Sequence, residues 1–259
     1  MSDSHGVFCW YELSTTNPEA ARAFYGEVVG FGTKAVPMGP MEYHMWVKPD
    51  GEGVIGGVST LAEEAKAMGA PPNWLIHVRV DDLAATVARC QELGGGVLLP
   101  PTEIPGSGHF AILSAFDGAA FGVFSGAQMG PSTGVDSTMG GVAWHEVMTS
   151  DVSRALAFYG DLFGWVDAGS MDMGPEGVYQ MFGKSADKAW GGMMARPAGM
   201  PMSAWLAYFT VPSADEAGER AARMGGKLMH TMDVPGGRIA TMCDPQGAAF
   251  AVWSGAAQN

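Results

Sequence analysis

The sequence predicts an α+β protein built from two copies of one domain, and three observations support this. Short motifs recur at a nearly constant spacing. Strand and helix patterns follow the same order in both halves, and a stretch rich in Gly, Ser and Thr separates the halves. We therefore predict a first domain at residues 7–126, a linker at 127–141 and a second domain at 142–255.

The repeat is clearest in four motifs that contain aromatic residues. Trp10-Tyr11-Glu12 and Phe24-Tyr25-Gly26 each return 134 residues later, as Trp144-His145-Glu146 and Phe158-Tyr159-Gly160. Trp74-Leu75 returns as Trp205-Leu206 after 131 residues, and the Gly118–Phe121 motif returns as Gly247–Phe250 after 129. The drift in spacing requires only small deletions, which loops absorb.

The first strand and the first helix of each copy have recognisable local signals. Residues 10–15 and 144–149 alternate as strands do. Asn17-Pro18-Glu19 then supplies an N-cap, a proline in the first turn and an acid that faces the helix dipole. Gly30 ends this helix.

The later elements of the first copy follow in the same manner. Further strands are predicted at 43–47, 54–59, 74–80, 97–99, 110–113 and 120–124. A second helix runs over 82–93 and is closed by Gly94 and Gly95. In the second copy, Ser213 and Glu216 form a capping box for the last helix.

Composition narrows the range of partners. The chain has 259 residues and a net charge of −13, and it lacks a Lys/Arg cluster, which argues against nucleic acid. No apolar run has the length of a membrane span, and the N-terminus lacks a signal pattern, so we expect a cytoplasmic protein. The three cysteines have no metal-type spacing and are expected to be core thiols in a reducing compartment. The oligomeric state is left open.

The ordered set of motifs resembles the vicinal-oxygen-chelate superfamily, which includes glyoxalase I, bleomycin-resistance proteins and extradiol dioxygenases. The resemblance rests on Phe24-Tyr25, Gly94-Gly95 and Gly118-x-x-Phe121, together with their counterparts in the second copy. It covers nearly the whole chain. The second copy has the family's Asp-Pro-x-Gly turn at residues 244–247, whereas residues 115–118 of the first copy depart from it.

This resemblance implies that two paired βαβββ modules in each copy curl around a cavity. Enzymes of the family hold a divalent metal there, with ligands from the first and last strands of each module. In this chain the expected ligand positions carry side chains that cannot bind a metal: Trp10, Gly56, Leu75, Gly122, Trp144, Gly191, Leu206 and Ala251. Because a catalytic metal needs about three protein ligands, we expect neither a metal site nor another cofactor.

Alternation along the strands then gives the candidate ligand-binding residues. The first cavity would offer Trp10, Glu12 and His77. The corresponding residues of the second cavity are Trp144, Glu146 and Tyr208. Large rings at the metal positions would fill the space of the ion or form a floor for a flat ligand.

Each candidate also has a structural interpretation. Glu12 and Glu146 either accept hydrogen bonds from the backbone or a Trp indole, or act as general bases whose pKa is raised by an apolar pocket. His77 is either a core histidine or a site residue, and the tryptophans are either core aromatics or ligand contacts.

Three functions remain open on these grounds. The first is a metal-free protein that binds a small organic molecule. The second is a metal-free enzyme that uses Glu12 or Glu146 as its base. The third is a lyase or dioxygenase with displaced metal ligands such as Glu12 and His77.

Overall fold

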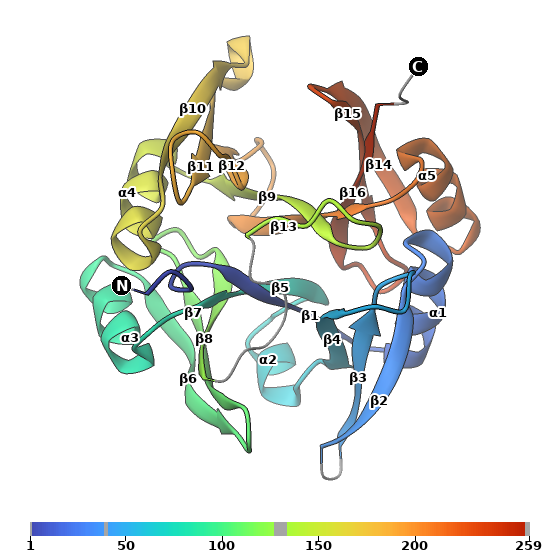
Figure 1. Ribbon diagram of the computed structural model, residues 1–259, viewed down its shortest axis with the longest axis horizontal. Helices are drawn as coiled ribbons and strands as arrows, with labels where there is room; N and C mark the ends of the chain where they lie inside the picture. The colour runs from blue at the N-terminus through green and yellow to red at the C-terminus, as the bar shows by residue number, and fades with distance from the viewer. Residues whose placement is uncertain (1, 39–40, 127–133, 257–259) are drawn as a thin grey trace. The chain divides into compact units, whose positions relative to one another are not determined.

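Each copy of the repeat forms two βαβββ modules in the computed structural model, which describes residues 2–38, 41–126 and 134–256 (Figure 1). The first copy contains β1 (Phe8–Thr15), α1 (Pro18–Val28), β2 (Gly32–Met38), β3 (Met41–Val47), β4 (Val54–Thr60), α2 (Glu63–Ala67), β5 (Asn73–Arg79), α3 (Leu83–Glu92), β6 (Gly96–Ile104), β7 (Gly108–Ser114) and β8 (Ala120–Gly126). The second contains β9 (Val142–Thr149), α4 (Val152–Phe163), β10 (Val166–Asp172), η1 (Gly174–Glu176), β11 (Val178–Gly183), β12 (Gly191–Ala195), β13 (Ala204–Thr210), α5 (Ala214–Arg223), β14 (Lys227–Val234), β15 (Gly237–Cys243) and β16 (Ala249–Gly255).

The strands form two eight-stranded mixed sheets with the same topology. Their orders are β2-β3-β4-β1-β5-β8-β7-β6 and β10-β11-β12-β9-β13-β16-β15-β14. Within each module the first strand pairs in parallel with the last, as β1 does with β4 and β9 with β12. The predicted α+β class is therefore confirmed, and the two sheets have the same strand order.

Local capping signals account for the helix starts. The side chain of Asn17 accepts a hydrogen bond from the backbone N–H of Ala20 at 3.0 Å, and Pro18 occupies the first helical turn. Ser213 caps α5 in the same way, accepting from the N–H of Glu216. Gly30 follows α1 with a φ of 90°, the left-handed conformation that glycine adopts without strain.

The turn before the last strand has the same backbone in both copies, although its sequence differs. Gly118 and Gly247 have φ values of 92° and 100°, and their N–H groups donate to the carbonyls of Ala115 and Asp244. The departure from Asp-Pro-x-Gly in the first copy therefore leaves the turn intact.

Contacts between residues divide the chain into two compact units, and each unit contains half of each copy. The first unit comprises 1–10, 76–134 and 144–205, and the second comprises 11–75, 135–143 and 206–259. The boundaries at 126 and 142 follow the sequence repeat, and their use as domain limits stays a prediction. The predicted linker falls partly outside the described residues.

Aromatic residues form the core between helices and sheet in each unit. In the second unit the indole of Trp74 donates to the hydroxyl of Tyr25 at 2.8 Å, and that hydroxyl donates to Asp244 at 3.1 Å. In the first unit the indole of Trp205 donates to the hydroxyl of Tyr159 at 3.0 Å. Trp74 and Trp205 are thus core aromatics, as the structural interpretation held.

Within the described residues, no helix is both long and apolar enough to cross a membrane. Cys9, Cys90 and Cys243 are free thiols, the first two of them buried. Burial raises the pKa of Cys9 to about 12 and that of Cys90 to about 11, so both are held as neutral thiols.

Candidate functional site

Glu12 lies at the centre of a small polar cluster in the second unit. The hydroxyl of Tyr43 on β3 donates to its Oε2 at 2.8 Å, and the hydroxyl of Ser59 on β4 donates to its Oε1 at 2.7 Å. Glu12 and Ser59 are half-buried. Because both carboxylate oxygens accept hydrogen bonds, the acid is held in one orientation on β1.

Glu146 has the equivalent arrangement in the first unit, with a different third member. The hydroxyl of Tyr179 on β11 donates to Oε2 of Glu146 at 3.0 Å, and the indole of Trp144 on β9 donates to the same hydroxyl at 2.7 Å. Because an indole N–H can only donate, the phenol must direct its own proton to the carboxylate. Burial, and next the negative charge of Glu146, raise the pKa of Tyr179 well above its usual value.

A glycine on the last strand of the module makes room for each tyrosine. Gly57 pairs with Glu12 and Gly192 pairs with Glu146 across the parallel strands. A Cβ atom at Gly57 would overlap the Tyr43 hydroxyl, and one at Gly192 would overlap the Tyr179 ring. From the sequence, the metal-ligand positions of these strands were predicted at Gly56 and Gly191. These two residues pair with Tyr11 and His145 and so lie on the face opposite to Glu12 and Glu146. The positions on the same face as the acids are one residue later, at Gly57 and Gly192.

Tyr43 and Tyr179 were not among the residues predicted from the sequence, whose structural interpretation named the backbone or a Trp indole as the donor to the acids. The indole of Trp144 instead reaches Glu146 through Tyr179. A signal for the tyrosines does exist, because Tyr43 and Tyr179 lie 136 residues apart, close to the repeat spacing.

The structure places the other predicted site residues on the expected strands. Trp10 lies on β1 and is 9% exposed; it belongs to the first unit, whereas Glu12 belongs to the second. His77 on β5 pairs with Gly122 on β8, and a Cβ atom at Gly122 would overlap the imidazole. Tyr208 on β13 is buried and pairs with Ala251 on β16. Burial lowers the pKa of His77 to about 4, so the ring is neutral at pH 7.

Three further histidines lie outside the two carboxylate–tyrosine clusters. His145 is fully buried on the helix side of β9, where it stacks on Phe8 with ring centroids 3.6 Å apart. His44 on β3 lies beside the guanidinium of Arg22 on α1 at 3.2 Å, which also assigns it to the helix side. His109 is exposed on β7.

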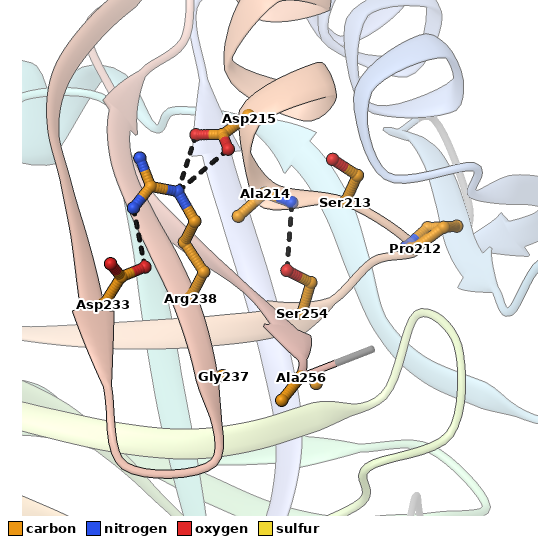
Figure 2. Close-up of a pocket in the computed structure, with 10 residues that line it drawn as sticks. Pro212, Ser213, Ala214, Asp215, Asp233, Gly237, Arg238, Ser254 and Ala256 are labelled. Atoms are coloured by element: carbon orange, nitrogen blue, oxygen red, sulfur yellow. Dashed lines mark hydrogen bonds and ion pairs between the residues drawn. The ribbon is translucent and has the colours of Figure 1, made fainter. Parts of the chain in front are cut away.

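A surface hollow of about 300 Å³ lies at the start of α5 in the second unit (Figure 2). Its cation, Arg238, contacts both oxygens of Asp215 at 2.8 and 2.9 Å and Asp233 at 2.7 Å. Two carboxylates already match this positive charge, so an anion would have to displace one of them. None of the predicted site residues lines this hollow.

Comparison with known proteins identifies the family. The family model of the Glyoxalase/Bleomycin resistance protein/Dioxygenase superfamily matches residues 8–123. CFP32 of Mycobacterium tuberculosis (strain CDC 1551 / Oshkosh), whose name proposes a glyoxylase, is 33% identical over 96% of this chain and 95% of its own length. The chain belongs to this superfamily. The anthracycline biosynthesis protein DauV of Streptomyces sp. (strain C5) is 27% identical over 95% of the chain and 92% of its own length.

Solved structures of this superfamily share the fold at low sequence identity. The Mn(II)-bound glyoxalase of Novosphingobium aromaticivorans matches 97% of the chain and 82% of its own, with a TM-score of 0.64 and 14% identity. The 2,3-dioxygenase LapB of Pseudomonas sp. KL28 matches 96% of the chain and 92% of its own, with a TM-score of 0.65 and 12% identity. These likenesses concern the architecture alone.

The metal that some members of the superfamily hold does not fit the side chains at the corresponding positions of the described residues. Among the residues that the structure describes, no three side chains of His, Cys, Asp or Glu gather to hold a metal ion. Gly57, Gly122, Gly192 and Ala251 offer no ligand atom on the last strands of the four modules. Glu12 and Glu146 each accept a hydrogen bond from a tyrosine hydroxyl, and a metal ion would have to replace this bond.

Proposed function

We propose that this protein binds a small organic molecule without the metal site of its superfamily, using the sheet faces that carry Glu12–Tyr43 and Glu146–Tyr179. The observation that carries the proposal is the repeated cluster of an oriented carboxylate, a tyrosine and a facing glycine. In each copy the tyrosine occupies the space that a metal-coordinating side chain on the last strand of the module would need. A carboxylate held in this way can accept a hydrogen bond from a hydroxyl or amine of a ligand.

The chemistry of the clusters favours a ligand that donates hydrogen bonds. Carboxylate oxygens only accept, and the chain carries a net charge of −13, which disfavours anions. DauV and DnrV are named for anthracycline biosynthesis, and this supports a planar aromatic molecule for the present chain. An anthracycline aglycone is therefore a suitable probe, because it is planar and carries hydroxyl groups.

Two measurements on the full chain test this proposal. Elemental analysis of the purified protein should find no stoichiometric Zn, Fe, Mn or Ni, and equilibrium dialysis should show saturable binding of the aglycone that added EDTA leaves unchanged. About one such metal per chain, lost on Glu12→Gln or His77→Gln, would contradict the metal-free assignment. Absence of saturable binding by the aglycone would contradict its use as the ligand class.

A second candidate function is metal-free catalysis with Glu146 as general base. It is favoured by the burial of Glu146, which is 9% exposed beside Trp144 and Tyr179. An acid in such surroundings is suited to remove a proton next to a ligand carbonyl. Glu146→Gln should then abolish turnover of a bound ketone while its binding persists, whereas a pure binding protein shows no turnover with either side chain.

A further inference from the structure

The two copies have the same carboxylate–tyrosine–glycine cluster but differ in the side chains around it. On β9, β11 and β12, the face that carries Glu146 also carries Met148, Met181 and Met194, because residues two apart on a strand share a face and paired residues point the same way. Met194 pairs with Met148, and Met181 pairs with Gly192. We call this surface, together with Trp144 and Tyr179, the methionine face.

The methionine face lies on the side of the half-sheet away from α4. The alternate residues His145, Val147, Phe182 and Met193 are almost completely buried, and α4 packs against β10, β11 and β12. By contrast, the three methionines, Trp144 and Tyr179 are half-buried. This face therefore combines apolar, adaptable side chains and two aromatic rings with a single carboxylate.

The corresponding face of the first copy is polar. Ser14 lies two residues after Glu12 where the second copy has Met148, and it pairs with Ser59 where the second copy has Met194. Met45, which pairs with Gly57, is the counterpart of Met181. The hydroxyl of Ser59 donates to Glu12, a bond that a methionine at this position cannot make.

We infer that Met148 and Met194 make the second copy the site for a planar, largely apolar molecule with a hydroxyl or amine at one edge. Ser14 and Ser59 make the first copy unsuited to such a molecule. The inference rests on the proposed function and adds to it the copy that binds and the residues that select. The ring system lies against the two thioethers and Trp144, while the donor group reaches Glu146. Methionine suits this role because its flexible, polarisable side chain adapts to rings of different shape.

The experiment uses the full chain and the anthracycline aglycone, with binding followed by equilibrium dialysis and fluorescence. The wild-type protein should bind one aglycone per chain. Met148→Ser with Met194→Ser should weaken binding about tenfold or more, because the loss of apolar contact with a ring is of that order. Met202→Ser with Met224→Ser is the matched control, because these methionines are exposed and lie outside the methionine face; it should leave the dissociation constant unchanged.

The exchange of side chains in the opposite direction strengthens the test. Ser14→Met with Ser59→Met should raise the stoichiometry from one to two aglycones per chain. Two equal sites in the wild type, or an unchanged dissociation constant in the folded Met148→Ser, Met194→Ser variant, would overturn the inference while leaving the proposed function in place. Absence of any saturable binding would overturn the inference and, with it, the ligand class given under the proposed function.

A measurement on the unaltered chain covers the case in which the serine variant fails to fold. In protein labelled with 13C at the methionine methyl groups, the aglycone should shift the resonances of Met148 and Met194 and leave that of Met45 in place. Single Met→Leu substitutions assign these resonances. A shift of Met45 alone would place the ligand in the first copy and overturn the inference.

Discussion

The hydroxyl of Tyr179 lies 3.0 Å from Oε2 of Glu146, and it is held there by the indole of Trp144 at 2.7 Å on its other side. The phenol thereby connects the indole, which can only donate a hydrogen bond, with the carboxylate, which accepts one. Tyr43 and Glu12 form the same pair in the first copy at 2.8 Å. Both pairs join the first strand of a module to its third strand.

Tyr179→Phe should destabilise the protein by about 1–3 kcal/mol, because it removes both the acceptor of the Trp144 indole and a donor to Glu146. Urea unfolding followed by circular dichroism measures the change. Met224→Leu is the control, because this exposed residue lies outside the cluster and its replacement should leave the stability unchanged. A loss for Tyr179→Phe below about 0.5 kcal/mol would show that water replaces the phenol and that the cluster does little for stability.

Gly57→Ala and Gly192→Ala should each cost about 1–3 kcal/mol, because the added methyl group overlaps a tyrosine that must then move. Thermal unfolding at pH 7 measures the loss. Gly32→Ala is the control, because its methyl group would meet Val47 only at an ordinary contact distance of 3.6 Å. If all three variants unfold alike, the tyrosines are free to rotate away and the glycines are not required for the clusters.

The protein should lose stability as the pH falls below about 6.5, because two buried histidines are held neutral in the folded state. Burial lowers the pKa of His77 to about 4 and that of His145 to about 3. Between these values and 6.5 the unfolded chain binds more protons than the folded one, so stability falls with pH through this window. For His77 the loss reaches about 3 kcal/mol near pH 4.

Urea midpoints at pH 7, 6, 5 and 4 test this expectation. His77→Gln should reduce the slope between pH 6.5 and 4, since glutamine does not titrate, and His109→Gln should leave it unchanged because His109 is exposed. Equal slopes for the wild type and His77→Gln would contradict the assignment of a neutral, buried His77.

Local signals predicted the helices well, whereas partners across the sheet were harder to derive. Asn17 caps its helix through the N–H of Ala20 three residues away, so the sequence contains the whole interaction. β2 and β10 were missed because both are exposed edge strands without apolar alternation, as Lys34 and Pro37 illustrate. Strand register depends on which residues pair across the sheet. A shift of one residue exchanges Gly57, which pairs with Glu12, for Gly56, which lies on the opposite face.

The same reasoning explains which parts of the site were predicted. Glu12 and Glu146 were predicted because each lies two residues after a tryptophan at the same position of its copy. Their tyrosine partners come from strands more than thirty residues away, and only the sheet brings them together. Aligning the copies at a spacing near 135 would have matched Tyr43 with Tyr179 and Gly57 with Gly192.

Replacement of Glu12 separates a structural role from a chemical one. Glu12→Gln retains the shape of the side chain, and the hydroxyls of Ser59 and Tyr43 can rotate to suit an amide, so stability should change by less than about 1 kcal/mol. Glu12→Leu leaves both hydroxyls without this acceptor and should cost about 2–4 kcal/mol.

Urea unfolding gives the two stabilities, and binding of the anthracycline aglycone gives the second readout. If the role of Glu12 is purely structural, the Glu12→Gln variant should bind the aglycone as the wild type does. Glu146→Gln should weaken binding at the methionine face, because the ligand loses the charged carboxylate that accepts its hydrogen bond. If Glu12→Leu is as stable as the wild type, the carboxylate is not needed to satisfy Tyr43 and Ser59. Contact with a ligand would then have to explain why β1 carries a carboxylate.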